Sequence, residues 1–235
     1  MEPFLVVGLV LVVIAAAVLL AMASAKAARQ RREDLAAWAA SRGWRFEDDG
    51  SATEEFRRFP AFRRGHGRVA YNTTSGAVTI KGREFLLACG DFQFRESRGS
   101  GKNRRTVTVR FSYVSVRAPG SPPDLTIRPE GFFDKVVQAL GADDIDFESD
   151  QFSRAFCVTC ADKKFAYDVV SPRMMEQLLA TRPPPISLVG GHVCFLGGNR
   201  TWAIPEYERE IARLTAFFEL WPEYVLEDLA LRGAE

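Results

Sequence analysis

The sharpest chemical motif in the sequence is the cysteine pair Cys157 and Cys160, which reads CVTC. A redox pair with this spacing needs its first thiol at a helix N-terminus, where the helix dipole lowers the thiol pKa. The surrounding run AFCVTC is typical of a strand instead, and strand positions three apart point to opposite faces. We therefore expect two buried thiols rather than a redox centre.

Zinc binding is the alternative for this pair, because a structural zinc site needs four ligands. His192 and Cys194 are the candidates for the other two ligands, since they lie two apart on one face of an expected strand. The opposed faces of Cys157 and Cys160 argue against zinc unless a turn intervenes. With Cys89 there are four cysteines in the chain, too few for a disulfide scaffold of this length, and no metal ligand is assigned.

Nucleophilic catalysis finds little support in the two histidines. His66 lies in the glycine-rich connector RRGHGR and is expected to be a solvated turn residue, whereas His192 lies in an apolar strand and is expected to be packed. The sequence holds neither a Gly-x-Ser-x-Gly elbow nor a Walker loop. No catalytic and no cofactor-binding residue is assigned, and no cofactor is expected.

Carboxylates gather in the run Asp143 to Glu148, which reads DDIDFE. The run lacks the spaced ligands and the central glycine of a calcium loop. We expect a solvated loop that leads into a strand.

Basic residues gather in the connection Glu96 to Arg105, at Arg98, Lys102, Arg104 and Arg105. This polar, glycine-containing segment is typical of an exposed hairpin tip. Its charges could touch anionic lipid or RNA, although a charged loop is usually only solvated. The chain as a whole has 31 Lys and Arg against 30 Asp and Glu, so no nucleic-acid partner is expected.

The elements that must position these residues begin with an uncharged stretch from Phe4 to Ala25. A bilayer core about 30 Å thick needs roughly 20 apolar residues in a helix, so this stretch is long enough to span it. A cleaved secretory signal is the rival, because residues 23–25 read ASA. The leader carries no Lys or Arg and the apolar run is too long for a signal, which favours an uncleaved anchor.

Charge on the two flanks of the span predicts its orientation. Basic residues follow it directly, whereas only Glu2 and the amino terminus precede it; the basic residues are Lys26, Arg29, Arg31 and Arg32. Basic residues next to a span stay in the cytoplasm, so we expect the N-terminus outside and the rest of the chain in the cytoplasm.

A helix is expected to continue from the span through Lys26 and to stop at Gly43. A short helix is expected over Ser51 to Phe59, with Ser51 as its cap and Glu54 completing a capping box. The region 66–128 alternates Val, Phe, Thr and Tyr between turn residues and predicts antiparallel strands. Within it, Val107 to Tyr113 predicts a half-buried strand.

The second half repeats a unit of strand, proline and helix. The three copies are LTIRPEGFFDKVVQAL, FAYDVVSPRMMEQLLA and RTWAIPEYEREIARL, and each proline falls near the first turn of a helix. In the middle copy Ser171 is the expected cap, and Met174, Met175, Leu178 and Leu179 form the expected apolar face. The final helix is expected from about Glu206, with an interruption at Trp221 and Pro222.

Several of these segments together resemble a family of bacterial membrane-anchored proteins, most familiar from actinobacteria and described as a domain of unknown function. The resemblance covers nearly all of the chain after the span; it is carried by RGWRF (42–46), GREFLLACGDFQF (82–94), RPEGFFDKVVQALG (128–141), DFESDQFSRAFCV (146–158) and FAYDVVSPRMMEQLL (165–179). It implies an N-terminal span with a cytoplasmic α+β domain and carries over no functional residue. The pair Cys157 and Cys160 is not part of the family pattern.

The sequence thus predicts an α+β protein, with one N-terminal transmembrane helix followed by mostly antiparallel strands and packed helices. The expected parts are an anchor (1–25), a juxtamembrane helix (26–43) and two α+β halves (44–141 and 142–235). We expect a binding or scaffolding domain on the cytoplasmic face of the cell membrane, with lipid and an unidentified protein as partners. The alternatives are a hydrolase-like enzyme with a motif-free site and a sensor of anionic lipid.

Overall fold

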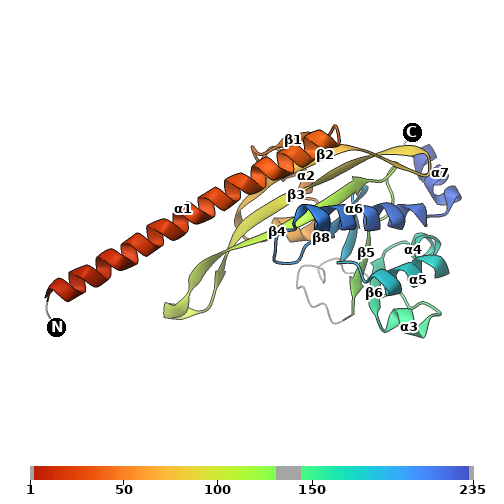
Figure 1. Ribbon diagram of the computed structural model, residues 1–235. Helices are drawn as coiled ribbons and strands as arrows, with labels where there is room; N and C mark the ends of the chain where they lie inside the picture. Colours follow the sequence, from red (N-terminus) through yellow and green to blue (C-terminus); the bar gives the residue numbers. More distant parts are fainter. Residues whose placement is uncertain (1–2, 131–143, 233–235) are drawn as a thin grey trace.

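The computed structural model describes residues 3–130 and 144–232, and it begins with one long helix, α1 (Pro3–Ser41). The N-terminal part of α1 projects away from the rest of the protein, and its C-terminal part lies against the sheet (Figure 1). The helix is long and apolar enough to cross a membrane, with a mean hydropathy of 2.8 over its most apolar window. The expected helix from the span to Gly43 is therefore confirmed, and Gly43 follows its end with a φ of +68°.

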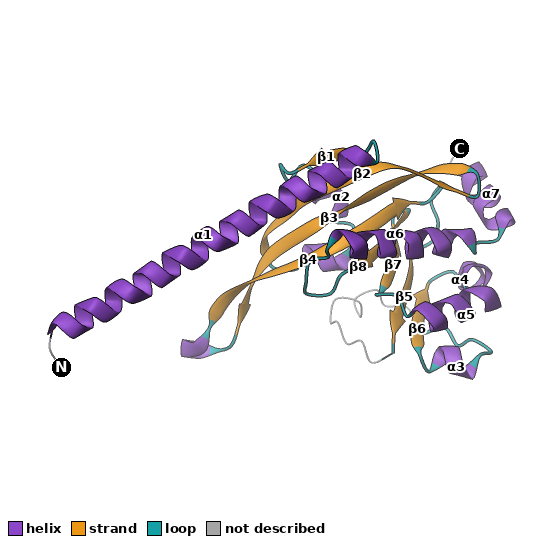
Figure 2. Cartoon of the chain, viewed as in Figure 1, coloured by secondary structure: helices purple, strands orange, loops and turns teal. Residues whose placement is uncertain are grey.

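The α+β class is also confirmed, because a single eight-stranded sheet follows α1 with helices packed on it (Figure 2). Its strands are β1 (Arg45–Glu47), β2 (His66–Ile80), β3 (Arg83–Arg98), β4 (Arg105–Arg117), β5 (Leu125–Pro129), β6 (Phe156–Cys160), β7 (Ile186–Val189) and β8 (His192–Leu196). Their order is β1-β2-β3-β4-β8-β7-β5-β6, with every neighbouring pair antiparallel. Strand β5 pairs with both β6 and β7, so the sheet runs without a break through the two expected halves.

Helices pack on both faces of this sheet. They are α2 (Thr53–Phe56), η1 (Pro60–Arg63), α3 (Asp150–Ser153), α4 (Lys163–Val169), α5 (Pro172–Thr181), α6 (Ile204–Glu219) and α7 (Glu223–Arg232), while the short η2 (Gly101–Asn103) lies at the tip of the β3–β4 hairpin. The larger core joins α1, α6 and α7 to one face and includes Leu35, Leu214 and Trp221. The smaller core lies on the other face, where Phe56 and Phe62 of the segment from α2 to η1 cover β3 and β4.

Two expected caps have different outcomes. Ser171 does cap α5, since its hydroxyl accepts from the Met174 backbone N–H, and Met174 and Leu178 are buried. The capping box at Ser51 is wrong, because α2 begins at Thr53 after an uncapped Ala52. The Ser51 N–H instead donates to Asp49 Oδ1, which places Ser51 in a turn before the helix.

Two expected strands are also wrong. Residues 165–169 belong to α4 and Val170 is its C-cap, while Asp162 caps the start of the helix through the Phe165 N–H, so the middle unit is helix followed by helix. Residues 200–203 form an extended connection without strand pairing, because the Ser112 hydroxyl holds the Trp202 N–H and Trp202 packs against Tyr207. The helix expected after LTIR falls on 131–143, outside the described residues.

A buried carboxylate, Asp91 of β3, joins α1 to the sheet. Arg31 of α1 donates to it from Nε and Nη2, each at 2.8 Å. Three further donors complete its shell, namely Asn72 Nδ2, Ser112 Oγ and Tyr207 Oη at 2.9, 2.6 and 2.9 Å. Asp91 is fully buried and Arg31 retains only 26 % side-chain exposure, so the ion pair depends on this complete set of partners.

We expect Asp91→Asn to lower the free energy of unfolding by about 3–5 kcal/mol, because it leaves the partly buried Arg31 charge without its carboxylate. Denaturant unfolding of the full chain in detergent, followed by tryptophan fluorescence, measures the change. Glu33→Gln is the matched control, since it breaks only the exposed Arg29–Glu33 pair and should cost less than about 0.5 kcal/mol. An Asp91→Asn midpoint equal to that of the unaltered protein would show that the pair is not required.

Candidate functional site at the basic end of the sheet

One end of the sheet, where β2 begins, β3 ends and β4 begins, concentrates positive charge. The stretches 63–71 and 92–111 hold eight Arg and one Lys against a single carboxylate, Glu96. The formal net charge of the whole chain is only +1, so this charge is strongly localised. We define the basic end by seven of these eight arginines, leaving out Arg64, which is bonded to Glu96; the seven are exposed or half-buried and are Arg63, Arg68, Arg95, Arg98, Arg104, Arg105 and Arg110.

Strand pairing brings some of these like charges together. Arg98 of β3 is the direct cross-strand partner of Arg105 of β4. Like charges placed opposite each other destabilise a sheet, so this arrangement costs free energy of folding. Gly65, with a φ of +59°, lets the chain enter β2 tightly against β3, since a Cβ there would lie 2.2 Å from the Arg95 carbonyl oxygen.

Glu96 cannot neutralise this end by itself. Burial opposes its ionisation, but hydrogen bonds and charges from Arg98 and Arg64 outweigh that effect and leave its pKa below the usual value. Both of its oxygens are already engaged, at 2.6 Å from Arg98 and 3.2 Å from Arg64. Arg95, Arg104 and Arg105 make no ion pair within residues 3–130 and 144–232, so their charge is available to a partner.

The basic end lies on the same side of the domain as the apolar part of α1. Asp91, Gln93 and Arg95 alternate along β3, so Arg95 shares the sheet face on which Arg31 meets Asp91. Figure 1 shows the β3–β4 hairpin and the N-terminal part of α1 projecting from the same end of the sheet. A membrane crossed by α1 would therefore face the basic end.

The four basic residues that follow the span differ in their partners. Arg31 is held by Asp91, while Arg29 pairs with Glu33 at 2.9 Å and Arg32 with Asp48 at 3.1 Å. Lys26 is exposed and makes no ion pair within the part of the chain that the structure describes. The positive charge of the residues that follow the apolar part of α1 is thus largely compensated by carboxylates. The basic end is therefore the larger surface of uncompensated positive charge.

The four candidate zinc ligands do not come together. Cys157 and Cys160 lie on β6, whereas His192 and Cys194 lie on β8. Two strands separate β6 from β8, a gap of roughly 14 Å at the usual strand spacing. No group of three or more His, Cys, Asp or Glu within the described residues could hold a metal ion.

All four cysteines are free thiols and buried, the state expected for the CVTC pair. Burial, followed by the neighbouring Asp144, raises the pKa of Cys157 to about 11. Burial likewise raises the pKa values of Cys89, Cys160 and Cys194. These thiols stay protonated near neutral pH and are therefore poor nucleophiles.

The two histidines occupy different surroundings. His66 is exposed at the start of β2, within the basic end, and lies opposite Arg95. His192 is half-buried, and its Nδ1 lies 4.0 Å from Glu55 Oε1. Burial first, then the charges of Arg58 and Arg117, lower the pKa of His192 to about 4. Such a weak base is unsuited to activating a hydroxyl nucleophile near pH 7.

Two residues of the 143–148 run stabilise the fold, Asp144 through its carboxylate and Asp146 through its backbone carbonyl. Asp144 Oδ1 accepts from the Val158 N–H at 2.8 Å, and the Asp146 carbonyl accepts from Tyr167 Oη at 3.0 Å. The first member of the run, Asp143, lies outside the described residues. The described part is a loop that forms one bridge to Thr159 before α3, not a direct lead into a strand.

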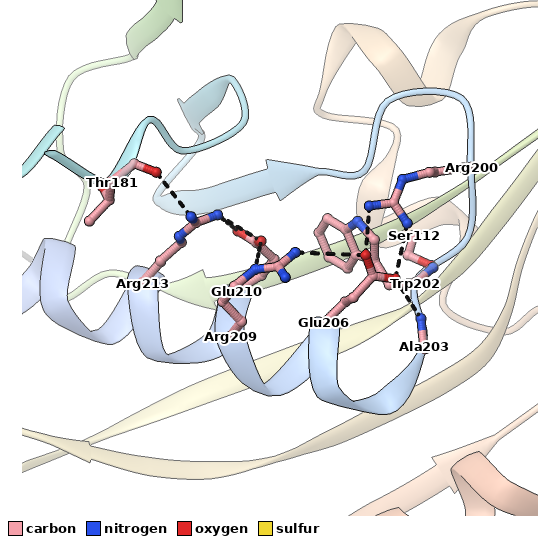
Figure 3. A network of polar contacts seen from close by, with 9 residues as sticks. All are labelled: Ser112, Thr181, Arg200, Trp202, Ala203, Glu206, Arg209, Glu210 and Arg213. Carbon is pink, nitrogen blue, oxygen red and sulfur yellow. Dashed lines mark hydrogen bonds and ion pairs between the residues drawn. The ribbon is translucent and has the colours of Figure 1, made fainter. Parts of the chain in front are cut away.

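A row of charges along α6 is a further polar cluster, one that sequence reasoning missed (Figure 3). Arg200 pairs with Glu206, whose Oε2 also accepts from the Ala203 N–H, and this lowers the pKa of Glu206 to about 2. Arg213 binds the buried Glu210 at 2.9 Å and the Thr181 carbonyl at 2.9 Å. Every charge in the row has an internal partner, so it stabilises α6 and offers no free group to a ligand.

Sequence reasoning also missed Asp91 and most of the basic end. Asp91 alternates with the buried Leu87 and Cys89 along β3, so a carboxylate at an inward position was the available signal. The hairpin tip was recognised, but Arg63, Arg68 and Arg95 join it only through the pairing of β2 with β3. Lys102 belongs to the same segment in sequence.

Comparisons with known proteins do not identify a family for the chain. No family model matches the chain, so the resemblance to a domain of unknown function gains no support there, and no curated protein matches it either. The crystal structure of the mycobacterial trehalose monomycolate transport factor A, TtfA, matches with a TM-score of 0.49 and 12 % identity, over 82 % of this chain and 95 % of that chain. A likeness of this size carries no argument about function.

We expect a thiol reagent such as Ellman's reagent to leave the four cysteines of the folded protein unmodified at pH 8, because they are buried and their pKa values are raised. After denaturation all four should react. The released thionitrobenzoate, measured by absorbance, counts them in each state. Rapid reaction of two thiols in the folded protein would instead indicate an accessible Cys157 and Cys160 pair.

Proposed function

We propose that the protein is a single-pass membrane protein whose α+β domain binds the anionic surface of the membrane that holds α1. The observation that carries the proposal is the position of the basic end, which projects on the same side as the apolar part of α1. In this proposal the basic end reaches the membrane surface when the domain tilts about α1. The domain acts as a binding or scaffolding module in this proposal.

The energetics favour lipid over other anions. Each Lys or Arg near an anionic bilayer contributes about 1 kcal/mol, and the attraction decays over a Debye length of roughly 8–10 Å. Seven arginines of the basic end are exposed or half-buried, and several of them have no internal counter-charge. The anchor keeps this surface at a high effective concentration next to lipid headgroups, whereas RNA would bind from solution.

We further propose that the N-terminus lies outside and the domain lies in the cytoplasm. Lys26, Arg29, Arg31 and Arg32 follow the span and support this orientation. The cytoplasmic leaflet is also the one that carries anionic lipid, so the two parts of the proposal agree. The remainder of the domain surface would then face the cytoplasm, where a protein partner could be held at the membrane.

Binding is favoured here over catalysis. Ser115, His192 and Glu55 have the residue types of a hydrolytic triad and line one groove. The Ser115 hydroxyl has no hydrogen-bond partner, however, so it is not linked to the imidazole as a nucleophile is to its base. The lowered pKa of His192 also argues against a hydrolytic triad, because such a weak base is unsuited to activating a hydroxyl near pH 7.

The membrane contact can be tested with a polarity-sensitive dye on Ser100→Cys at the hairpin tip, in full-length protein held in nanodiscs. We expect blue-shifted emission with phosphatidylglycerol, loss of the shift at high salt, and no shift with phosphatidylcholine alone. Replacing Arg98, Arg104 and Arg105 with Gln should remove about 3 kcal/mol, a decrease of roughly 100-fold in the ratio of docked to undocked domain.

A matched control replaces Arg154, Lys163 and Arg173 with Gln, since these exposed residues lie on or beside α3, α4 and α5. The control should leave the emission shift unchanged. If both triple variants lose the shift equally, or neither does, the basic end is not the membrane contact.

Orientation is tested separately with reporters fused to the C-terminus. We expect activity from a cytoplasm-active reporter and none from an exterior-active one, together with an intact mass that retains residues 1–25, because the basic flank holds this side in the cytoplasm. Replacing Glu2 with Lys is a control that should change neither reporter strongly. Exterior activity would contradict the proposed orientation.

A further inference from the structure

Among the described residues, four buried side-chain polar atoms have no hydrogen-bond partner, and one of them, the Ser115 hydroxyl on β4, lines a groove. Ser115 is only 2 % exposed, and its Oγ has no hydrogen-bond partner. Its cross-strand neighbours are Ala88 and Cys194, which offer it no strong acceptor. A buried hydroxyl without a partner costs about 1–3 kcal/mol, so its retention calls for an explanation.

Ser115 lines a groove of about 590 Å³ on the sheet face that also carries α2. The floor is the row of small residues Ser75, Ala88 and Ser115 on β2, β3 and β4. The walls are α2 with the residues that follow it, the loop at Gly120 and the tight β7–β8 turn at Gly190 and Gly191. Both turn glycines have positive φ values, 54° and 77°, as a type I′ hairpin turn requires.

Two arginines converge on this groove. Arg58 is fixed over the β7–β8 turn, since its Nε donates to the Glu55 carbonyl at 2.8 Å and its Nη1 to the Gly190 carbonyl at 3.0 Å. Arg117 is exposed at the end of β4, and its side chain makes no ion pair or hydrogen bond with the described residues. Both charges act on His192, and they help to keep its imidazole neutral. Glu55 is the one carboxylate among the groove residues described, so positive charge is in excess.

The floor of the groove turns apolar beyond Arg117. Leu86 on β3 is 61 % exposed, although it lies on the sheet and not at its tip. Leu86 and Arg117 also line a second hollow of about 710 Å³, whose other walls include Phe85, Ala118 and Leu231 together with the charged residues Arg83, Glu84 and Glu227. Leu231 is 72 % exposed, so apolar surface lines both sides of this hollow. The two hollows therefore meet at Leu86 and Arg117, with Arg58, Arg117 and the Ser115 hydroxyl in one hollow and a mostly apolar lining in the other.

We propose that this groove binds an amphipathic anion, with a carboxylate or phosphate head at Arg58, Arg117 and the Ser115 hydroxyl and an aliphatic body over Leu86. The head gives the Ser115 hydroxyl an acceptor and gives Arg117 a counter-charge. Arginine suits both heads because its planar fork can donate two parallel hydrogen bonds. The joined hollows fall in the size range of small-molecule sites, about 300–1,000 Å³ each. This site is separate from the basic end and does not depend on the proposed membrane contact.

The two histidines provide a direct test, because they give only two imidazole signals. The full chain, labelled with ¹³C at histidine Cε1 and held in phosphatidylcholine nanodiscs, is titrated with octanoate, octyl phosphate, acetate and inorganic phosphate. We expect saturable movement of the His192 signal with octanoate or octyl phosphate, and binding at least about 10-fold weaker with the two anions that lack a chain. The signal of His66, in the basic end, is the internal reference for general anion binding.

Substitutions distinguish an effect on ligand binding from an effect on folding. Arg117→Gln should weaken binding at least 10-fold, whereas Arg173→Gln, an exposed arginine on α5, should not change it. Ser115→Ala should weaken binding while leaving stability equal or raised, because the hydroxyl it removes has no partner in the free protein. Ser121→Ala is the matched serine control on the groove rim.

Each outcome of the titration either supports or contradicts the proposed site. Tighter octanoate than octyl phosphate assigns a carboxylate head, and the reverse assigns a phosphate head; both support the site. Equal affinity for acetate and octanoate, or for inorganic phosphate and octyl phosphate, would refute the proposed contact between an aliphatic chain and Leu86. A His192 signal that does not move, or that moves equally in Arg117→Gln, would overturn the proposal.

Discussion

The ion pair between Arg31 and Asp91 is the constraint on which the rest of the structure depends. It joins α1, a helix that is uncharged from Pro3 to Ala25, to the central strands of the sheet. Leu35 and Trp38 continue the contact on the same helical face. Because Asp91 also binds Ser112 and Tyr207, the anchor helix, the central strands and α6 share one buried polar centre. The placement of every surface relative to the membrane follows from that centre.

The two faces of the sheet then take different roles. One face is covered by α1, α6 and α7 and forms the larger core. The other is covered by aromatic side chains of the segment from α2 to η1 near the basic end, and it is left open at the far end, where Leu86 is exposed. The basic end and the groove at Ser115, the two surfaces for which we propose partners, thus occupy opposite ends of the same long hairpins. Separation of this kind allows both to be occupied at once.

Features that depend on neighbouring residues could be predicted from the sequence, and features that depend on distant ones could not. The apolar span, the alternation from Val107 to Tyr113 and the Ser171 cap are local patterns, and all three were recognised correctly. The strand prediction for residues 165–170 is wrong because it rests on aromatic and β-branched side chains, which favour strands. In the structure, burial of Phe165, Ala166 and Val169 follows a helical period. The partners of Asp91 lie 19 to 116 residues away, so no local pattern could indicate them.

The Asp91 centre also constrains how the chain is made. Arg31 precedes Asp91 by 60 positions in the sequence, whereas Tyr207, another donor to Asp91, follows it by 116. Synthesis runs from the N-terminus, so the shell of Asp91 is complete only after α6 has been made. Until then β3 carries a charged group whose shell is incomplete. The polar centre of the domain can therefore form only after the strands β1 to β8 have been synthesised.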